Sequence, residues 1–412
     1  MPRKVKRLGV WLGDDLIAAL EQPRPFRITC RYSQLALERW EGNSPVLSCS
    51  LPIGARRLDA LAFCRGLLPE GRALEYMARR ANVAVNDVFA LLAHFGRDVA
   101  GAFSIFEDGS SPRSRQPQAA CYGANELEQE IDELPERPLA LHDDSELSLA
   151  GLQNKILLVA LPNGEWARPV HGYPSTHILK TDDLLHPGLL DAEAACLQLA
   201  RTVGLTSISA ELRDFGDTRC LIVSRFDRRE TTVGPPERIH QEDLCQATGT
   251  DPADARGRAK YERAGGPGFK QLAALLSEHA TDADGQLDKL VQVMTFNVLI
   301  GNADAHGKNL ALLHQPLENV ALAPLYDTVP TMLWSKLRAD SAMSVAGVRS
   351  LEQITVDALA TEAASWRYPR DRAHELATGL IERVAEAAEA SGFHEAVRGL
   401  VLSRARRLLC RV

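Results

Sequence analysis

The side chains best suited to catalysis lie together in the stretch Gly301–Leu310, "GNADAHGKNL", which directly follows the apolar run "VQVMTFNVLI". The stretch combines an acid, a histidine, a lysine and two amides. Glycine, asparagine and aspartate are ordinary turn residues, but a turn does not need this whole mixture. The pattern therefore indicates an active-site loop at the end of a buried helix.

The neighbouring elements must bring these side chains together. The apolar residues of the preceding helix fall on one face, namely Leu287, Leu290, Val291, Met294 and Val298, and Gly301 is placed to cap the helix. The next stretch, "LALLHQPLENVALAP", has two apolar runs around a turn, which predicts an antiparallel hairpin. Folding about that turn sets residue 324 opposite Asn309, so that Asn309 and Asp327 fall within about 10 Å of each other.

These side chains suit phosphoryl transfer. An amide and a carboxylate, here Asn309 and Asp327, are oxygen ligands that fit Mg²⁺. Asp304 is then available as the base that receives the proton of an acceptor hydroxyl, and Lys308 adds positive charge toward the phosphate. The alternative is a surface loop in which Asp and Asn only cap turns. Asp304 alone does not exclude that alternative, whereas the three residues together favour an active site, and His306 alone indicates a loop-bracing group.

Phosphoryl transfer also requires a nucleotide site. The stretch "SLAGLQNKILL", which begins at Ser148, is a small-residue turn that runs into a strand, where backbone N–H groups can face phosphates. Lys180 ends the strand "THILK", and Glu193 on the next helix is placed to orient it. A strand-edge lysine and an exposed helical glutamate are the alternatives. The stretch "VSRFDRR" ends a strand at a lobe junction, which makes Ser224–Phe226 a candidate adenine hinge.

Strand and helix patterns predict an α+β protein. Residues 1–106 alternate short strand-like runs, such as "PVLSCSLP", with helical patterns, and Glu107–Glu146 is polar and acidic like a linker or an ordered surface loop. The runs "KILLVAL" and "WARPV" flank "PNGE" as a hairpin, and the chain after Arg228 is mainly helical, with long patterns at 285–300, 357–366 and 372–391. The expected domains are 1–106, 107–228 and 229–412.

Composition narrows the class of protein. The 412 residues are 45% hydrophobic and 25% charged, which allows two or three globular domains, and a net charge of −7 argues against bulk-charge coating of nucleic acid. The eight cysteines are scattered without a CxxC pair, which fits a reducing cytoplasm. No apolar stretch of the length needed for a membrane span is evident, so the expectation is a cytoplasmic protein without membrane contact.

Nine motifs in order resemble the HipA-type serine/threonine kinases, the toxins of bacterial toxin–antitoxin pairs. They are "LLPEG", "GRDVAGAF", "SLAGLQNK", "THILK", "RFDRR", "HQEDLCQATG", "GGPG" and "NADAHGKN", followed by "PLYD". The resemblance implies a two-lobed protein-kinase-like fold with a small N-terminal α+β subdomain, a β-rich nucleotide lobe and a helical C-terminal lobe. It also implies ATP and Mg²⁺ as cofactors.

The resemblance implies a role for each matching residue. Asp304 would be the catalytic base, Asn309 and Asp327 the metal ligands, and Ser148 the site of an inactivating autophosphorylation. The residues implied to bind ATP are Ala150, Gly151, Leu152, Gln153, Asn154, Lys155, Lys180, Ser224, Arg225, Phe226, His306, Gly307, Lys308, Asn309, Tyr326 and Asp327. The implied partners are a small helix-turn-helix antitoxin (HipB-like), operator DNA mainly through that antitoxin, and a protein substrate of the aminoacyl-tRNA synthetase class.

Two other readings stay open. A small-molecule kinase of the aminoglycoside-phosphotransferase type uses a similar Asp, Asn and Asp set, although the N-terminal region and "SLAGLQNK" argue against it. A catalytically silent corepressor would act only with an antitoxin on DNA, and the presence of Asp304, Asn309 and Asp327 argues against that reading.

Overall fold

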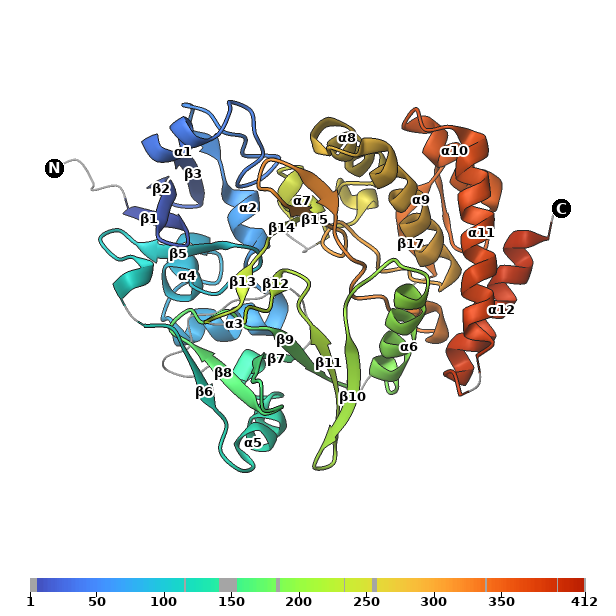
Figure 1. The fold of residues 1–412 in the computed structure, drawn as a ribbon, viewed down its shortest axis with the longest axis horizontal. Coiled ribbons are helices and arrows are strands. Elements are labelled where there is room, and N and C mark those ends of the chain that lie inside the picture. The colour runs from blue at the N-terminus through green and yellow to red at the C-terminus, as the bar shows by residue number, and fades with distance from the viewer. Residues whose placement is uncertain are drawn as a thin grey trace. The chain divides into compact units, whose positions relative to one another are not determined.

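The computed structural model describes residues 6–114, 116–140, 154–182, 186–232, 234–253, 258–337, 339–390 and 392–410. The chain forms two compact units, drawn in Figure 1. Unit 1 comprises Met1–Thr181, Arg213–Pro252 and Leu313–Glu318, and unit 2 comprises Asp182–Leu212, Ala253–Leu312 and Asn319–Val412. Each unit is assembled from several separate segments of the chain. The domains expected from the sequence are instead continuous segments, and their boundaries at 106 and 228 stay predictions.

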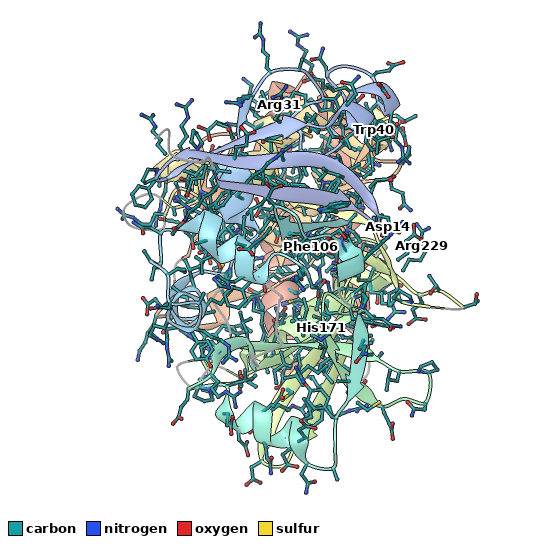
Figure 2. The ribbon with its side chains drawn as sticks, turned by 90° about the vertical axis from the view of Figure 1, so that its left-hand side faces the viewer. Asp14, Arg31, Trp40, Phe106, His171 and Arg229 are labelled. Carbon is teal, nitrogen blue, oxygen red and sulfur yellow. The ribbon has the colours of Figure 1, made fainter. Side chains whose placement is uncertain are left out.

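Unit 1 begins with an antiparallel sheet in the order β4-β3-β2-β1-β5. Its strands are β1 (Lys6–Leu12), β2 (Asp15–Arg24), β3 (Arg27–Tyr32), β4 (Leu58–Asp59) and β5 (Phe103–Glu107). The helices of this region are α1 (Gln34–Arg39), α2 (Leu61–Gly66), α3 (Gly71–Arg80) and α4 (Val88–Phe95), and their apolar faces join the sheet in one core. In Figure 2, Arg31 on β3 and Trp40 after α1 lie at the same end of this unit.

The second sheet of unit 1 has the order β10-β11-β9-β7-β8-β6. Its strands are β6 (Gln118–Cys121), β7 (Lys155–Ala160), β8 (Trp166–Val170), β9 (His177–Thr181), β10 (Ala210–Phe215) and β11 (Thr218–Ser224). The predicted hairpin is confirmed, because β7 and β8 pair antiparallel and Gly164 takes the positive φ of 83° that a tight turn favours. His171, at the end of β8, lies beside this sheet in Figure 2.

The polar stretch from Glu107 is not a simple linker. It contributes the edge strand β6 and the helix α5 (Glu126–Glu133), whose Leu127 and Ile131 pack into the core of the second sheet. An edge strand and a helix with a single buried face need few apolar residues, so their composition looks like that of a loop. Residues 141–146 of this stretch lie outside the described residues.

Unit 2 is built mainly of helices, and the three long predicted helices are confirmed within two residues at each N-terminus. The helices are α6 (Leu189–Thr202), α8 (Phe269–His279), α9 (Ala283–Leu299), α10 (Val356–Ser365), α11 (Arg370–Ala388) and α12 (Glu395–Leu409). Figure 1 shows α9, α10, α11 and α12 as neighbours. The predicted hairpin is present as β15 (Ala311–His314) and β16 (Val320–Leu322).

The region after Arg228 also holds short strands that the sequence did not predict. They are β12 (Arg228–Arg229), β13 (Glu237–Arg238), β14 (His240–Asp243), β17 (Asp340–Val345) and β18 (Val348–Ser350), with the short helix α7 (Leu244–Ala247) after β14. Single 3₁₀ turns occupy Pro112–Ser114, Pro138–Ala140, Glu262–Ala264 and Thr331–Leu333. Strands of two to six residues carry too little periodicity to be separated from loops by pattern.

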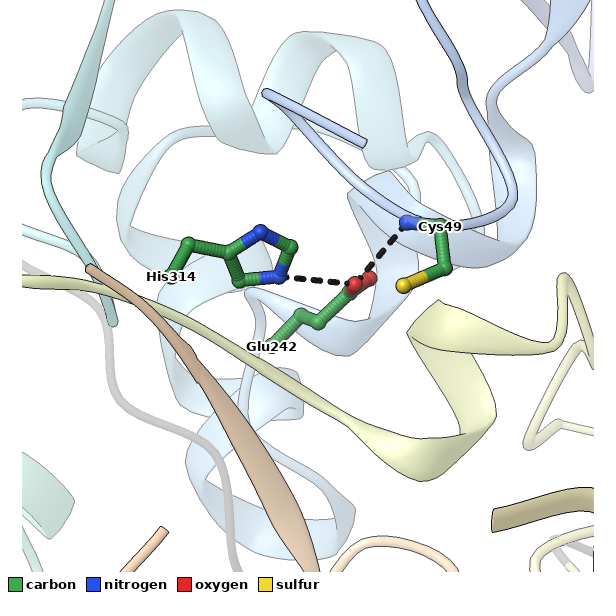
Figure 3. A group of neighbouring side chains, drawn as sticks. All are labelled: Cys49, Glu242 and His314. Atoms are coloured by element: carbon green, nitrogen blue, oxygen red, sulfur yellow. Dashed lines mark hydrogen bonds and ion pairs between the residues drawn. The ribbon is translucent and has the colours of Figure 1, made fainter. Parts of the chain in front are cut away.

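The run "PVLSCSLP" forms a loop, not the expected strand. Ser48 Oγ and the Cys49 N–H both donate hydrogen bonds to the buried Glu242 carboxylate, the latter at 2.9 Å. His314 Nε2 lies 3.0 Å from the same carboxylate (Figure 3). Cys49, Glu242 and His314 are of metal-ligand type and their ligand atoms lie within 4.8 Å of one another, but these hydrogen bonds already occupy the carboxylate. The group therefore ties this loop to β14 and β15 without needing a cation.

A buried ion network links separate parts of unit 1. Asp98 lies 3.0 Å from Arg228 and 2.6 Å from Arg238, and Asp227 lies 2.7 Å from Arg225 and 2.9 Å from Arg228. Burial opposes ionisation of Asp98, but the three guanidinium groups outweigh it and hold its pKa below the usual value. The network therefore joins the "GRD" stretch to the end of β11 by charge pairs that water does not screen.

Asp98→Asn should destabilise unit 1 by about 3–5 kcal/mol, because Arg238 would lose its counter-charge and Arg228 would keep only Asp227, which it shares with Arg225. Chemical unfolding measures the change. The matched control is Glu237→Gln, whose pair with Arg229 is 3.1 Å long but half exposed and should contribute at most about 1 kcal/mol. Equal effects of the two substitutions would show that the buried network is not what stabilises this unit.

Candidate active site

The loop at 301–310 starts from a fixed helix end. The predicted apolar face of α9 is buried, and the helix closes with two reverse hydrogen bonds, from Gly301 N–H to the Val298 carbonyl at 3.2 Å and from Asn302 N–H to the Asn297 carbonyl at 2.9 Å. Gly301 has a φ of 71°, the left-handed conformation that this type of cap requires. The predicted glycine cap is therefore confirmed, and it sets the direction in which the loop leaves the core.

Hydrogen bonds within the loop fix the backbone of Asp304. The Asp304 N–H donates to Asn302 Oδ1 at 2.9 Å, and the Asp304 carbonyl accepts from Asn309 Nδ2 at 2.9 Å. The His306 N–H donates to the same carbonyl at 2.8 Å. The Asp304 side chain stays 49% exposed. A rigid backbone with an accessible carboxylate is the arrangement that a general base needs.

The hairpin returns the chain to this loop, as predicted. The Ala323 N–H donates to the Ala311 carbonyl at 2.9 Å, which closes the hairpin at its open end. Asn309 and residue 324 lie beyond β15 and β16, so their predicted pairing stays a prediction. The Tyr326 hydroxyl donates to the Lys308 carbonyl at 2.7 Å, which holds the residue before Asp327 against the loop.

The donor set of the loop fits a hard cation. The Nδ2 of Asn309 is used in its bond to the Asp304 carbonyl, so the amide oxygen is the atom left for a ligand role. Asp327 supplies a carboxylate and takes a φ of 54°, which a non-glycine residue adopts at an energetic cost. Backbone strain of this kind is common at functional sites. The roles of Asn309 and Asp327 as metal ligands stay predictions.

His306 is a neutral bracing group. Burial and, to a smaller extent, the nearby Lys260 ammonium lower its pKa to about 3, and Asp327 opposes the shift. Its Nδ1 accepts a hydrogen bond from the Lys308 N–H at 3.3 Å. Because the ring is uncharged near pH 7, its approach of 3.9 Å to Asp304 is not an ion pair. The loop-bracing interpretation of His306 fits these contacts.

Two predicted phosphate-contacting lysines are neighbours in unit 1. Lys155 starts β7 and lies directly opposite Lys180 of β9 in the antiparallel register. Both residues are buried, with 6% and 7% of their surface exposed. Opposed residues on adjacent strands project to the same face of the sheet. The register therefore brings the two lysines together, and their contact with phosphates stays a prediction.

The predicted hinge residues begin at the last residue of β11. Ser224 pairs with His177 of β9, and the Arg225 N–H donates to the Thr176 carbonyl at 2.8 Å. The Arg225 side chain belongs to the buried ion network, where its Nε donates to Asp227 at 2.9 Å. A hinge contact by Arg225 would therefore use its backbone carbonyl. The adenine-binding role of Ser224, Arg225 and Phe226 stays a prediction.

Part of the predicted nucleotide site lies outside the described residues, namely Ser148, Ala150, Gly151, Leu152 and Gln153. Asn154 is the first described residue after this segment, and Gly307 lies buried in the 301–310 loop with its N–H 3.1 Å from the Lys260 carbonyl. Glu193 is buried on α6 with 1% of its surface exposed, which excludes the alternative of an exposed helical residue. Its pairing with Lys180 stays a prediction.

Two residues that contact Asp304 were missed from the sequence. Asn302 uses its side chain to bind the backbone of Asp304, and the Tyr261 hydroxyl donates to Asp304 Oδ1 at 2.7 Å. Asn302 lies within the 301–310 loop, but the sequence analysis gave it no role beyond being one of the two amides. Tyr261 is 43 residues away in sequence, and its one signal is the adjacent "GGPG", which served only as a family motif.

The chain belongs to the HipA family of kinase toxins. Residues 147–391 match the family model of the HipA-like C-terminal domain, and residues 8–106 match that of the HipA N-terminal domain. The family prediction made from the motifs is therefore confirmed.

Individual relatives support the same family. The chain is 34% identical to the putative kinase Y4mE of Sinorhizobium fredii over 391 residues. This alignment covers 93% of this chain and 91% of that protein. It is 30% identical to the serine/threonine-protein kinase toxin HipA of Shewanella oneidensis, over 83% of this chain and 79% of that protein. These relatives are named as kinases.

A solved structure shares the fold. It is that of the Shewanella oneidensis toxin–antitoxin system, containing HipA, HipB and operator DNA, and it matches with a TM-score of 0.80 and 26% identity over 98% of this chain and 96% of that chain. The predicted α+β, two-lobed kinase-like fold is thereby confirmed. Among the described residues, none of the helices has the length and apolar character required to cross a membrane.

The neutral state of His306 predicts a pH dependence of stability. The unfolded chain takes up a proton near the ordinary pKa of 6.5, while the folded chain does so only near 3, so stability falls as the pH drops from 6.5 toward 3. At pH 5 the loss attributable to His306 should reach about 2 kcal/mol relative to pH 7.5. In His306→Gln, the difference in unfolding free energy between these two pH values should shrink by that amount. An unchanged pH dependence would contradict the neutral assignment.

Proposed function

We propose that this chain is an ATP- and Mg²⁺-dependent serine/threonine protein kinase that acts as the toxin of a toxin–antitoxin pair. The observation that carries the proposal is the 301–310 loop, in which Asn309 braces the backbone of Asp304 while Tyr326 holds the Asp327 segment against Lys308. Membership of the HipA family supports the same chemistry.

In the proposed reaction, Asp304 accepts the proton of a serine or threonine hydroxyl as the hydroxyl oxygen attacks the γ-phosphorus of ATP. The bond from that phosphorus to the β–γ bridging oxygen breaks, and ADP leaves. Lys155 and Lys180 contact the phosphates, and Lys308 adds positive charge. Asn309 and Asp327 would hold Mg²⁺, which when bound neutralises charge on the phosphates.

The remaining nucleotide contacts are assigned in the same proposal. The segment from Ala150 to Lys155 lines the phosphates with backbone N–H groups, and Ser224–Phe226 holds the adenine by its backbone. His306, Gly307 and Tyr326 complete the pocket. The register that sets Lys155 opposite Lys180, with both side chains on one face of the sheet, supports the phosphate assignment.

The proposed partners follow from the family. The relative of known structure was solved as a complex of HipA, HipB and operator DNA, and a small helix-turn-helix antitoxin of the HipB type is proposed for this chain, with operator contact mainly through that antitoxin. The proposed substrate is a protein of the translation machinery, of the aminoacyl-tRNA synthetase class. The similarity to the serine/threonine-protein kinase toxin HipA over 83% of this chain favours a protein substrate over a small molecule.

Asp304→Asn should lower phosphate transfer by about 10³-fold or more, because the amide keeps the shape of the carboxylate but cannot accept the proton. Magnesium-dependent ADP release measures the loss. Circular dichroism and a nucleotide-binding titration serve as controls and should match those of the wild type. A folded, ATP-binding variant that retains turnover would remove Asp304 as the base.

Incubation with Mg-ATP should add one phosphate at Ser148, which places close to two negative charges at the start of the predicted phosphate segment and lowers activity. Intact-mass analysis and peptide mapping identify the site. Ser148→Ala should stay unmodified and active, while the matched control Ser145→Ala, in the same segment, should be phosphorylated like the wild type. Modification elsewhere would contradict the proposed off-switch.

A further inference from the structure

Tyr261 connects a separate segment of unit 2 to the 301–310 loop. Its hydroxyl donates to Asp304 Oδ1 at 2.7 Å, a length typical of a hydroxyl bound to a carboxylate. Its ring lies edge-on against His306, with ring centroids 5.0 Å apart and planes at 88°. Tyr261 therefore contacts the side chain of Asp304, whereas Asn302 and Asn309 contact its backbone.

The segment that carries Tyr261 is itself fixed. The Lys260 carbonyl accepts a hydrogen bond from the Gly307 N–H at 3.1 Å, so the residue before Tyr261 is bound to the loop. The Tyr261 carbonyl accepts from the Ala264 N–H at 2.9 Å and from the Gly266 N–H at 3.0 Å, which closes a tight turn. A Cβ on Gly266 would lie 2.5 Å from the Ala259 carbonyl oxygen, so the turn requires glycine there.

A second anchor holds the other side of this turn. The Glu262 carboxylate accepts hydrogen bonds from the Ser344 N–H and, at 3.0 Å, from the Ser344 hydroxyl on β17. Arg349 lies 3.8 Å from the same carboxylate. With Lys260 bound on one side and Glu262 on the other, the Tyr261 hydroxyl is held at a defined place. The turn before "GGPG" thus supports the 301–310 loop.

The Tyr261 hydroxyl restrains the orientation of the Asp304 carboxylate, which the backbone hydrogen bonds do not set. The backbone bonds of Asp304 leave rotation about its side-chain torsions undetermined, and the side chain is half exposed. A general base works only when one oxygen faces the proton that it accepts, and small misplacements reduce rates strongly. A hydrogen bond to Oδ1 fixes the carboxylate plane and therefore the direction of Oδ2.

We propose that Tyr261 is a positioning residue: its hydroxyl binds Asp304 Oδ1 and holds the carboxylate so that Oδ2 faces the acceptor hydroxyl. This inference rests on the proposed role of Asp304 as the base. Tyr261 does not take the proton and does not touch ATP. Its effect is confined to the rate of transfer, and nucleotide affinity is independent of it.

The test is Tyr261→Phe, which removes only the hydroxyl. The kcat for magnesium-dependent ADP release, with water as the acceptor, should fall about 10–100-fold while the KM for ATP stays within twofold of the wild-type value. The matched control is Tyr368→Phe, which removes another tyrosine–aspartate hydrogen bond, to Asp288, and should keep kcat within twofold. A merely structural role of Tyr261 would lower the thermal midpoint and would not separate kcat from KM.

The double variant Tyr261→Phe with Asp304→Asn decides whether the two residues act as one unit. It should be no slower than Asp304→Asn alone, because there is no carboxylate left to orient. A further drop in the double variant, an unchanged kcat in Tyr261→Phe, or a raised kcat that shows the hydroxyl competing with the acceptor would each overturn the inference. Full activity of Asp304→Asn would overturn the proposed function itself, so the two failures are distinguishable.

Discussion

The end of α9 is the constraint on which the candidate active site depends. Val298 and Asn297 accept the two reverse hydrogen bonds that close the helix, and Gly301 turns the chain in the left-handed conformation. Because the helix face is buried, this turn is anchored in the core of unit 2. The backbone of Asp304, three residues later, inherits a fixed position from that core.

Rigidity is then added locally by side chains that bind backbone groups. Asn302 and Asn309 bind the N–H and the carbonyl of Asp304, and Tyr326 binds the carbonyl of Lys308. Each of these bonds restrains the main chain but leaves the reacting group accessible. His306 also supports the loop without taking part in proton transfer, because burial keeps its ring uncharged.

In unit 1 the buried charges are neutralised by opposite charges. Its ion network surrounds each buried carboxylate with guanidinium groups, so that Asp98 and Asp227 stay ionised without water. Lys155 and Lys180 lie opposite each other on adjacent strands, so both side chains project to one face of the sheet. This arrangement supports the proposed phosphate contacts.

Local pattern in the sequence determined the elements that have a clear period and the residue types that carry chemistry. The face of α9, the Gly301 cap, the β7–β8 hairpin and the pairing of Asp304 with Asn309 in one loop all follow from spacing within about fifteen residues. The edge strand β6, the loop at Ser48–Cys49 and the position of Tyr261 do not, because their partners lie tens to hundreds of residues away. Only the tertiary structure decides such contacts, since a hydroxyl or a carboxylate has no preferred distant partner until packing brings one within hydrogen-bonding distance.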